Sequence, residues 1–387
     1  MSAPVPDRSL DTTIKRDPVP LDTAIRMIAI DMDGTLLGDD GHVSPRNLAA
    51  LHAAHAAGME IVVATGRRHS YAMHVLRPLE LHHASVLVSS NGTVTRTLGS
   101  FGADPIASKL IARAHLPHST ALWLCAQIRG SGDRDFSNAL VLTFDRVGPD
   151  GEDTRGALVV EHLDHLNASI GRWMAANEPY IAMVNPIESA LTSAESADGS
   201  NRDAPSQAPI QAMLCGTIER MARAEARLLE HPGVSASGHP SGRSGRTMNG
   251  SASHQSPGAP SMTASSSWVG RNTLEPPTEA APIITLHRTE YPDRDLSILD
   301  ILPAGCSKGA AILSLAAMRG IDASQILAVG DNWNDVSMLE IAGAAVLMDN
   351  APEDLKALAR TRGWRVGASN RDDGVADAIE ATLGVVC

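Results

Sequence analysis

The chain has 387 residues, which is enough for one large or two ordinary domains with a substantial core. Its formal net charge is −12 and aromatic residues make up only 3% of it, so it lacks the basic, ring-bearing surface that nucleic-acid binding needs. No apolar run approaches the roughly 18 residues of a membrane span. We therefore expect neither a nucleic-acid partner nor a membrane segment.

The N-terminal segment 1–20 combines charged residues and prolines without an apolar stretch. It therefore does not have the form of a secretory signal, and we expect a disordered leader. The cysteines show no paired spacing, which favours free thiols over a zinc site or a disulfide scaffold; they are Cys125, Cys215, Cys306 and Cys387. Both observations point to a reducing, cytoplasmic location.

Residues 21–93 alternate strand and helix signals. The apolar run from Ile25 to Ile30 predicts a buried strand, and Ser44 with Pro45 predicts the start of a helix that Gly58 closes. Three more elements follow: a strand over 59–64, a helix over 68–79 and a strand over 85–89. Short apolar strands separated by helices are typical of a parallel, doubly wound sheet.

The segment from Asp31 to Leu37, read as DMDGTLL, directly follows the first strand. Two carboxylates two residues apart leave the strand end on the same side, and Gly34 permits the sharp turn that follows. One carboxylate can then act as a nucleophile while Asp33 handles protons, as phosphoryl transfer through an aspartyl-phosphate requires. The alternative is a strand that simply ends in a polar turn, because Asp and Gly commonly terminate strands.

The middle of the chain, 94–293, has a different character and predicts a second, inserted α+β domain. Its strand and helix candidates lie at 140–144, 157–161, 167–177, 180–184, 211–215, 218–231 and 282–287. Two stretches, 188–208 and 232–281, are poor in large apolar residues and rich in Ser, Gly and Pro. Such segments cannot bury enough surface to offset their ordering entropy, so we expect disordered loops there.

The last part of the chain returns to the strand–helix alternation. Helices are expected over 308–320, 334–341, 352–360 and 375–383, with strands over 325–330 and 344–348. The first of these strands leads into Asp331. In open α/β sheets ligands bind beyond the carboxyl ends of the strands, and Asp31, Thr65, Asn91 and Asp331 all fall at such ends.

Six motifs stand in this order along the chain: DMDGTLL at 31–37, TGR at 65–67, NG at 91–92, SKG at 307–309, GDNWNDVSML at 330–339 and SNRDDGVADAI at 369–379. On these motifs the chain resembles the haloacid dehalogenase superfamily of phosphohydrolases, in its Cof-type branch with a large α/β cap. The resemblance implies an α/β fold: a doubly wound, parallel, Rossmann-like core formed by 21–93 and 294–387, with the α+β cap inserted as 94–293.

The resemblance also implies a role for each motif residue. Asp31 would be the nucleophile, Asp33 the general acid and base, and Lys308 the cation that neutralises developing negative charge. Thr65, Gly66 and Asn334 would contact the substrate's phosphate.

A Mg²⁺ ion is implied as well. It would be bound by Asp31, the backbone carbonyl of Asp33 and Asp331, while Asp335 would hold Lys308 or support the metal's ligands. Each residue also has a simpler reading: Thr65 can cap the next helix, Lys308 can be an ordinary helix-start lysine, and Asp331 and Asp335 can flank a capped helix.

Two positions depart from the family pattern: Asp349-Asn350-Ala351 stands where Gly-Asn-Ala is usual, and Asp300 stands where Glu is usual. Neither is a proposed catalytic residue. The sequence thus predicts a Mg²⁺-dependent phosphatase that acts on a small phosphomonoester, a sugar phosphate or a phosphorylated cofactor. The alternatives are a phosphomutase that uses the same aspartyl-phosphate, and a phospho-acceptor or binding module without turnover.

Overall fold

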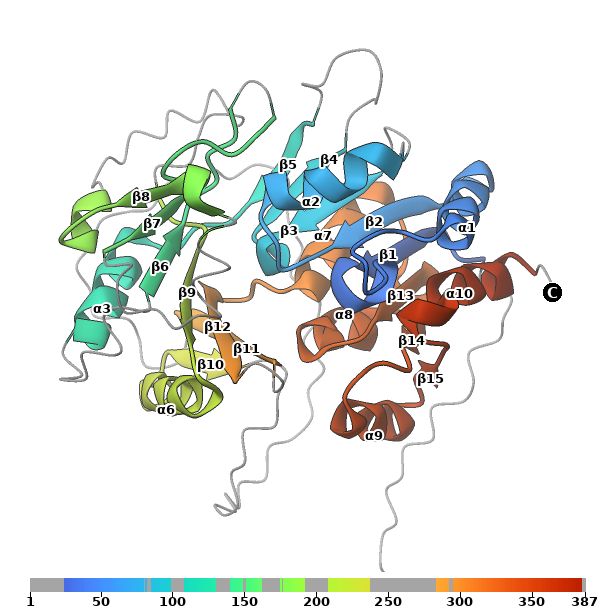
Figure 1. Ribbon diagram of the computed structural model, residues 1–387. Helices are drawn as coiled ribbons and strands as arrows, with labels where there is room; N and C mark the ends of the chain where they lie inside the picture. Colours follow the sequence, from blue (N-terminus) through green and yellow to red (C-terminus); the bar gives the residue numbers. More distant parts are fainter. Residues whose placement is uncertain are drawn as a thin grey trace, which may run out of the picture.

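The computed structural model describes residues 24–79, 81, 85–98, 108–129, 140–148, 151–161, 175, 177–191, 208–236, 283–291 and 295–384. In this part of the chain the strands form two sheets, which lie side by side in Figure 1. The predicted leader 1–20, most of the predicted loops 188–208 and 232–281, and most of the predicted helix 167–177 lie outside the described residues.

The first sheet has eight strands in the order β15-β14-β13-β1-β2-β3-β4-β5. The six strands from β15 to β3 pair in parallel, and β4 and β5 continue the sheet antiparallel at one edge. Their bounds are β1 Met27–Asp31, β2 Glu60–Ala64, β3 Val86–Ser89, β4 Val94–Thr97, β5 Leu110–Arg113, β13 Ile326–Gly330, β14 Ala344–Leu347 and β15 Arg365–Val366.

Helices cover both faces of this sheet (Figure 1). One face packs against α1 (Pro45–Ala56), α2 (His69–Leu76) and α10 (Gly374–Leu383), and the other against α7 (Lys308–Arg319), α8 (Val336–Ile341) and α9 (Glu353–Arg362). Alternate residues of β1 face the two layers: Ile28 and Ile30 belong to one apolar cluster, Met27 and Ala29 to the other. This is the burial pattern expected for a parallel strand covered on both sides.

Local sequence explains where several helices begin and end. The hydroxyl of Ser44 accepts a hydrogen bond from the Asn47 amide at the start of α1, and the hydroxyl of Ser307 accepts one from the Ala310 amide at the start of α7. At the end of α7 the chain leaves through Gly320 in the left-handed conformation, which costs glycine little.

The second sheet has seven strands in the order β10-β11-β12-β9-β6-β7-β8, and most of its pairs are antiparallel. Two helices, α3 (His118–Arg129) and α6 (Ile218–Leu228), pack on one of its faces. The strand bounds are β6 Leu140–Thr143, β7 Leu158–Val160, β8 Ile181–Met183, β9 Gln211–Gly216, β10 Val234–Ala236, β11 Ile284–Tyr291 and β12 Leu296–Pro303.

Short turns complete the described structure. Besides the tight turn η1 (Met32–Leu36), they are the 3₁₀ segments η2 Arg77–Leu79, η3 Ser90–Gly92, η4 Glu178–Tyr180, η5 Ile187–Ala190, η7 Ala323–Gln325, η8 Trp333–Asp335 and η9 Asn370–Asp372.

The predicted fold class, a doubly wound α/β core with an added α+β region, is confirmed. The change from one sheet to the other does not coincide with the predicted boundaries at 94 and 294: β4 and β5 extend the first sheet, whereas β12 lies inside the second. The predicted loop 232–281 is wrong at its start, because the buried Val234 and its neighbours pair with β11 as β10.

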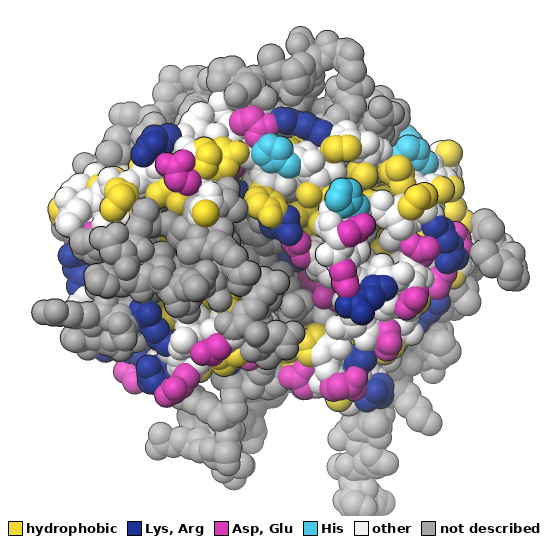
Figure 2. Space-filling view, viewed as in Figure 1, with side chains coloured by type: hydrophobic (Ala, Val, Ile, Leu, Met, Phe, Trp, Pro, Cys, Tyr) yellow, Lys and Arg dark blue, Asp and Glu magenta, His cyan; other side chains and the backbone are white. Residues whose placement is uncertain are grey.

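The surface around the first sheet mixes charges of both signs. On the face that Figure 2 shows, acidic and basic side chains alternate over the region of α9 and α10. Ion pairs join these helices to their neighbours: Arg46 of α1 binds Asp377 and Glu380 of α10, and Arg362 of α9 binds Glu340 of α8. Among the residues that the structure describes, no helix is long and apolar enough to cross a membrane.

Candidate active site

The carboxyl ends of neighbouring strands bring the predicted site residues together. Strand β1 ends at Asp31 and pairs in parallel with both β2 and β13. Thr65 follows β2, and Asp331 follows β13. Because parallel strands end at the same edge of a sheet, residues almost three hundred positions apart in the chain meet there.

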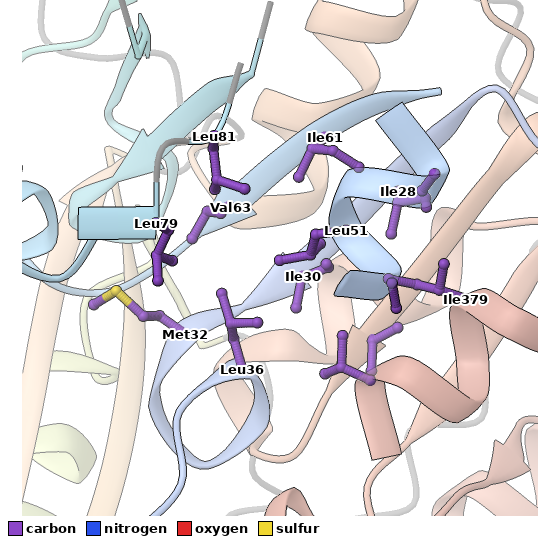
Figure 3. Packing of buried hydrophobic residues seen from close by; sticks show 14 of the residues in the cluster. Ile28, Ile30, Met32, Leu36, Leu51, Ile61, Val63, Leu79, Leu81 and Ile379 are labelled. Carbon is purple, nitrogen blue, oxygen red and sulfur yellow. The ribbon is translucent and has the colours of Figure 1, made fainter. Parts of the chain in front are cut away.

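The turn η1 fastens the DMDGTL segment to the core. Met32 and Leu36 are buried and lie near Ile30, Leu79 and Leu51 in the apolar cluster of Figure 3. Burial of Met32 and Leu36 fixes the backbone between them. Residues 33–35 are therefore held at the edge of the sheet.

Gly34 is required in this turn for two reasons. Its φ of +77° is a conformation that other residues rarely adopt, and a Cβ atom at this position would overlap the carboxylate of Asp331. Glycine therefore lets the η1 turn lie directly against Asp331.

Lys308 lies at the centre of the site. Its side chain is fully buried, and its Nζ donates a hydrogen bond to Asp31 Oδ1 and another, 2.7 Å long, to Asp335 Oδ1. It is the first residue of α7, and the close approach of this helix start depends on Gly309 and Gly92, where a side chain would overlap backbone atoms. The structure thus joins Lys308 to Asp335, as the resemblance implies, and also to Asp31.

Asp331 and Asp335 are held in different ways. Asp331 Oδ1 accepts a hydrogen bond from the Thr35 hydroxyl at 2.8 Å, and the Asn350 amide lies 3.4 Å from Oδ2. Asp335 Oδ2 accepts from the backbone amides of Asp331 and Asn332, both at 3.0 Å, while its other oxygen faces Lys308. Both oxygens of Asp335 are therefore engaged by the protein.

The buried charges shift one another's protonation. Burial raises the pKa of Asp31 well above its usual value, and the charge of Asp335 raises it further. Burial likewise raises the pKa of Asp331 to about 7, again with Asp335 as the second cause. For Lys308, burial lowers the pKa, but the carboxylates of Asp31 and Asp335 outweigh it and the net shift is upward.

This charge pattern fits a divalent cation. One oxygen each of Asp31, Asp331 and Asp335 lies within 4.8 Å of the others, so three carboxylates face the single ammonium group of Lys308. All-oxygen donors with excess negative charge are the setting in which Mg²⁺ binds. Asp335 is the poorer ligand of the three, because Lys308 and two backbone amides together hold its two oxygens.

The Asp33 side chain lies apart from this cluster. It is 45% exposed, and its Oδ1 accepts a hydrogen bond from the guanidinium of Arg67, which also stacks over the Tyr71 ring with 4.1 Å to the centroid. Asp33 is therefore open to an incoming molecule, as a group that exchanges protons with a substrate must be.

The remaining predicted contacts line the ends of β2 and β3. Thr65 is fully buried and its hydroxyl accepts a hydrogen bond from the Arg67 amide at 3.1 Å. The simpler reading, that Thr65 caps the next helix, is wrong, because the N-cap of α2 is Arg68 and no side chain caps that helix. A side chain at Gly66 would press on the amide of Asn91, and that amide lies 3.5 Å from the Asn334 amide. The structure thus brings Thr65, Gly66 and Asn334 to one edge of the site.

Sequence reasoning did not assign several residues that the structure places here. Thr35 and Asn350 both support Asp331, and Asn350 also donates to the Gly34 carbonyl at 2.8 Å. Asn91 donates to Asp300 of β12 at 2.9 Å and so links the two sheets. Thr35 lies inside the DMDGTLL motif and Asn91 inside the NG motif. Their place in these motifs is the sequence signal that could have indicated a role at the site.

Comparisons with known proteins agree with this geometry. A family model described as haloacid dehalogenase-like hydrolase matches residues 28–121 and 285–379, which together carry every predicted site residue. A curated relative, the 5-amino-6-(5-phospho-D-ribitylamino)uracil phosphatase YwtE of Bacillus subtilis, is 42% identical over 86 residues, or 22% of this chain and 29% of the relative. The first curated relatives are matched over 13% to 30% of their own length.

Solved structures match over much more of the chain but at low identity. A haloacid dehalogenase-like hydrolase from B. subtilis has a TM-score of 0.59 at 20% identity, covering 92% of this chain and 99% of that one. A sugar phosphatase of haloacid dehalogenase subclass IIB has a TM-score of 0.57 at 18% identity, covering 93% and 100%. These likenesses concern the fold. With its motifs, family match and fold in agreement, the chain belongs to the Cof-type branch of the haloacid dehalogenase superfamily.

Proposed function

We propose that the protein is a Mg²⁺-dependent phosphatase that hydrolyses a small phosphomonoester through an aspartyl-phosphate on Asp31. The observation that carries this proposal is the buried cluster in which Lys308 bridges Asp31 and Asp335 beside Asp331. A structural ion pair would balance its charges, whereas this cluster leaves negative charge uncompensated at a sheet edge where ligands bind.

The reaction would run in two steps. In the first, a carboxylate oxygen of Asp31 forms a bond to phosphorus, the ester P–O bond breaks, and the departing oxygen takes a proton from Asp33. In the second, Asp33 accepts a proton from a water molecule whose oxygen attacks phosphorus, which frees Asp31 and releases inorganic phosphate. The ammonium of Lys308 would stabilise the charge that develops near Asp31.

The cation would be held by Asp31 and Asp331, with the backbone carbonyl of Asp33 as a further donor. When bound, it would offset the repulsion between the anionic ester and the nucleophile. Asp335 would support the site without binding the cation, because it holds Lys308 and the backbone amides of the Asp331 loop in place.

The phosphate group would accept hydrogen bonds from Thr65 and the backbone at Gly66, which follow β2, and from the side-chain amide of Asn334 in η8. In support, these positions border the Asp31 edge, and the buried Asn91 lies between Gly66 and Asn334. A hydroxyl, backbone amides and a side-chain amide are groups that can donate hydrogen bonds to phosphate oxygens.

A sugar phosphate or a phosphorylated cofactor is the proposed substrate class. The matched curated relative is named for a phosphorylated ribityl compound, and a fold neighbour is named as a sugar phosphatase. The second sheet would cover the site during turnover and so favour small molecules over phosphoproteins.

The test is phosphate release from a panel of sugar phosphates, nucleotides and phosphorylated cofactors, with Mg²⁺ and with EDTA. We expect release that depends on Mg²⁺ and disappears in the Asp31→Asn protein. Consumption of a sugar phosphate without release of inorganic phosphate would indicate a phosphomutase instead. No reaction with any compound, by folded protein that binds Mg²⁺, would contradict turnover altogether.

A further inference from the structure

Two consecutive arginines reach partners in different parts of the molecule. Arg67 binds Asp33 at the candidate active site, whereas Arg68 binds Asp153, which follows β6 in the second sheet's part of the chain. Arg68 also donates to the Asn177 side chain at 2.6 Å and lies over the Tyr180 ring, 4.8 Å from its centroid. Arg68 and Asp153 are both 8% exposed, so their ion pair lies away from water.

The backbone between the two guanidinium groups is held on both sides. The Arg67 amide donates to the Thr65 hydroxyl at 3.1 Å, and the Arg67 carbonyl accepts from the Ser90 amide at 2.9 Å. The Arg68 carbonyl accepts from the Ala72 amide at the start of α2. Arg67 and Arg68 therefore extend from one anchored segment, and the Arg68–Asp153 ion pair is a further anchor of that segment on its α2 side.

The segment that carries Asp153 is itself a fixed structure. We call residues 144–157 the junction loop, of which all but 149–150 are described. Val147 and Asp153 form an isolated bridge, and the Gly148 amide donates to the Glu152 carbonyl at 2.7 Å. The Asp153 amide also binds the Ser70 hydroxyl of α2.

Three acidic residues of the junction loop each meet a basic residue of the first sheet's part of the chain. Asp153 binds Arg68, Glu152 binds Arg77, and Asp145 binds Arg96 at 2.7 Å as well as Arg113 at 2.9 Å. Only the first of these pairs includes a residue adjacent to Arg67. The pairs of Glu152 and Asp145 attach the loop through arginines that are ten or more positions away from Arg67 in the sequence.

We infer that Asp153 is a positioning residue for the acid–base step, because it holds Arg68 and thereby keeps Arg67 against Asp33. This inference rests on the proposed function. Arg67 fixes the orientation of the Asp33 carboxyl group. When the junction loop is attached through Arg68, this orientation directs Asp33, the proposed acid, toward the leaving oxygen. The second sheet thus contributes to catalysis through its attachment as well as by covering the site.

The experiment compares Asp153→Asn with Glu152→Gln, a matched control that removes a charge from the adjacent position of the same loop. Phosphate release is measured with p-nitrophenyl phosphate, whose leaving group needs no proton, and with an alkyl phosphomonoester, whose leaving group does. The quantity compared is kcat/KM, because it reports the steps up to departure of the alcohol.

For Asp153→Asn we expect kcat/KM to fall about tenfold or more with the alkyl ester and less than about twofold with the aryl ester, part of the roughly 10²–10⁴-fold that acid–base catalysis supplies. Glu152→Gln should leave the ratio of the two esters unchanged. An equal fall in kcat/KM with both esters, or the same selective fall in Glu152→Gln, would show that Asp153 makes only a structural contact and would overturn the inference.

Arg68→Lys tests the same link if Asp153→Asn does not fold. Lysine keeps the buried positive charge but replaces the planar fork, whose two terminal nitrogens bind Asp153 and Asn177 separately, with a single nitrogen. It should show the same selective loss with the alkyl ester, and a wild-type ratio would contradict the inference. Failure of the proposed function would look different, since the wild-type protein would then release phosphate from neither ester.

Discussion

The two sheets bury charge in opposite ways. At the edge of the first sheet, three carboxylates lie close together, Lys308 bonds to two of them, Asp31 and Asp335, and the pKa of the third, Asp331, rises to about 7. At the junction with the second sheet, Asp145 is also buried, but two arginines face it, and their hydrogen bonds and charges outweigh the effect of burial and lower its pKa. A balanced cluster connects parts of a protein, whereas an unbalanced one prepares a site for a ligand.

Both sheets have apolar clusters on both faces, so they differ in where their buried polar residues lie. The first sheet has apolar clusters on both faces beneath helices, which leaves its strand ends as the place where polar residues gather. The second sheet also carries apolar clusters on its two faces, and the buried polar contacts between its part of the chain and the first sheet include those of Asp145, Asp153 and Asp300. The proposed catalytic groups therefore all lie at the edge of the first sheet, whereas these contacts attach the second sheet to it.

Replacing the nucleophile should have the largest effect. Asp31→Asn keeps the shape of the side chain but removes the attacking oxygen charge, so we expect phosphate release to fall by at least about 10³-fold. The protein should remain folded, because Lys308 keeps its hydrogen bond to Asp335. Circular dichroism with a phosphate-release assay checks both points, and substantial remaining activity would contradict the assignment of Asp31.

Removal of the acid and base should have the next largest effect. Asp33→Ala takes away a half-exposed carboxyl group, so stability should change little while turnover falls about 10²–10⁴-fold. Rapid-quench measurement of the phosphorylated enzyme should show that both its formation and its breakdown are slower. Unchanged rates for both steps would remove Asp33 from the mechanism.

The sequence predicted the five neighbouring strands β14, β13, β1, β2 and β3 of the first sheet because their signals are local, but not β4, β5 or β15. Apolar runs followed by Asp31, Thr65 and Asp331 mark strand ends, and Ser44 and Ser307 mark helix starts that the structure contains. The meeting of Asp31 with Asp331 follows from parallel pairing alone. The predicted roles of these residues remain predictions, although their positions in the structure are compatible with them.

The contacts of the second sheet could not be predicted in this way. Arg68 and Asp153 are 85 positions apart, and neither belongs to a periodic pattern or a motif that would pair them. No strand was predicted at the residues of β12, and the boundary at 294 placed them in the core with the SKG motif that follows, whereas they pair with β11 and β9 in the second sheet. Ionic contacts between domains depend on geometry that composition and periodicity do not encode.

The charge balance of the first sheet can be tested by removing its cation. Lys308→Met leaves the carboxylates of Asp31, Asp331 and Asp335 buried without a positive partner, which should lower the free energy of unfolding by about 3–5 kcal/mol. Mg²⁺ should recover part of this loss, because it can neutralise the same groups. Chemical denaturation with Mg²⁺ and with EDTA measures both effects, and a variant as stable as the wild type in EDTA would contradict the proposed charge imbalance.

The smallest predicted effect concerns the contact between the sheets at Asp300. Burial raises the pKa of this carboxyl group to about 7, while the Asn91 hydrogen bond opposes the shift. Because the folded pKa lies above the unfolded value of about 3.9, the group stabilises the fold most below pH 4, and this contribution is lost as the pH rises to about 7. Asp300→Asn cannot ionise and should lack that decline.

The measurement is the melting temperature of wild-type protein and Asp300→Asn between pH 5 and pH 8 in EDTA. The titrations of Asp31, Asp331 and the cross-strand neighbour His287 occur in both proteins, so the difference at each pH isolates Asp300. We expect the wild type to lose a few °C relative to the variant over this range. Parallel curves would mean that Asp300 ionises as easily in the folded protein as in the unfolded chain. The junction at Asn91 would then be an ordinary polar contact, and the unbalanced buried charge would be confined to the first sheet.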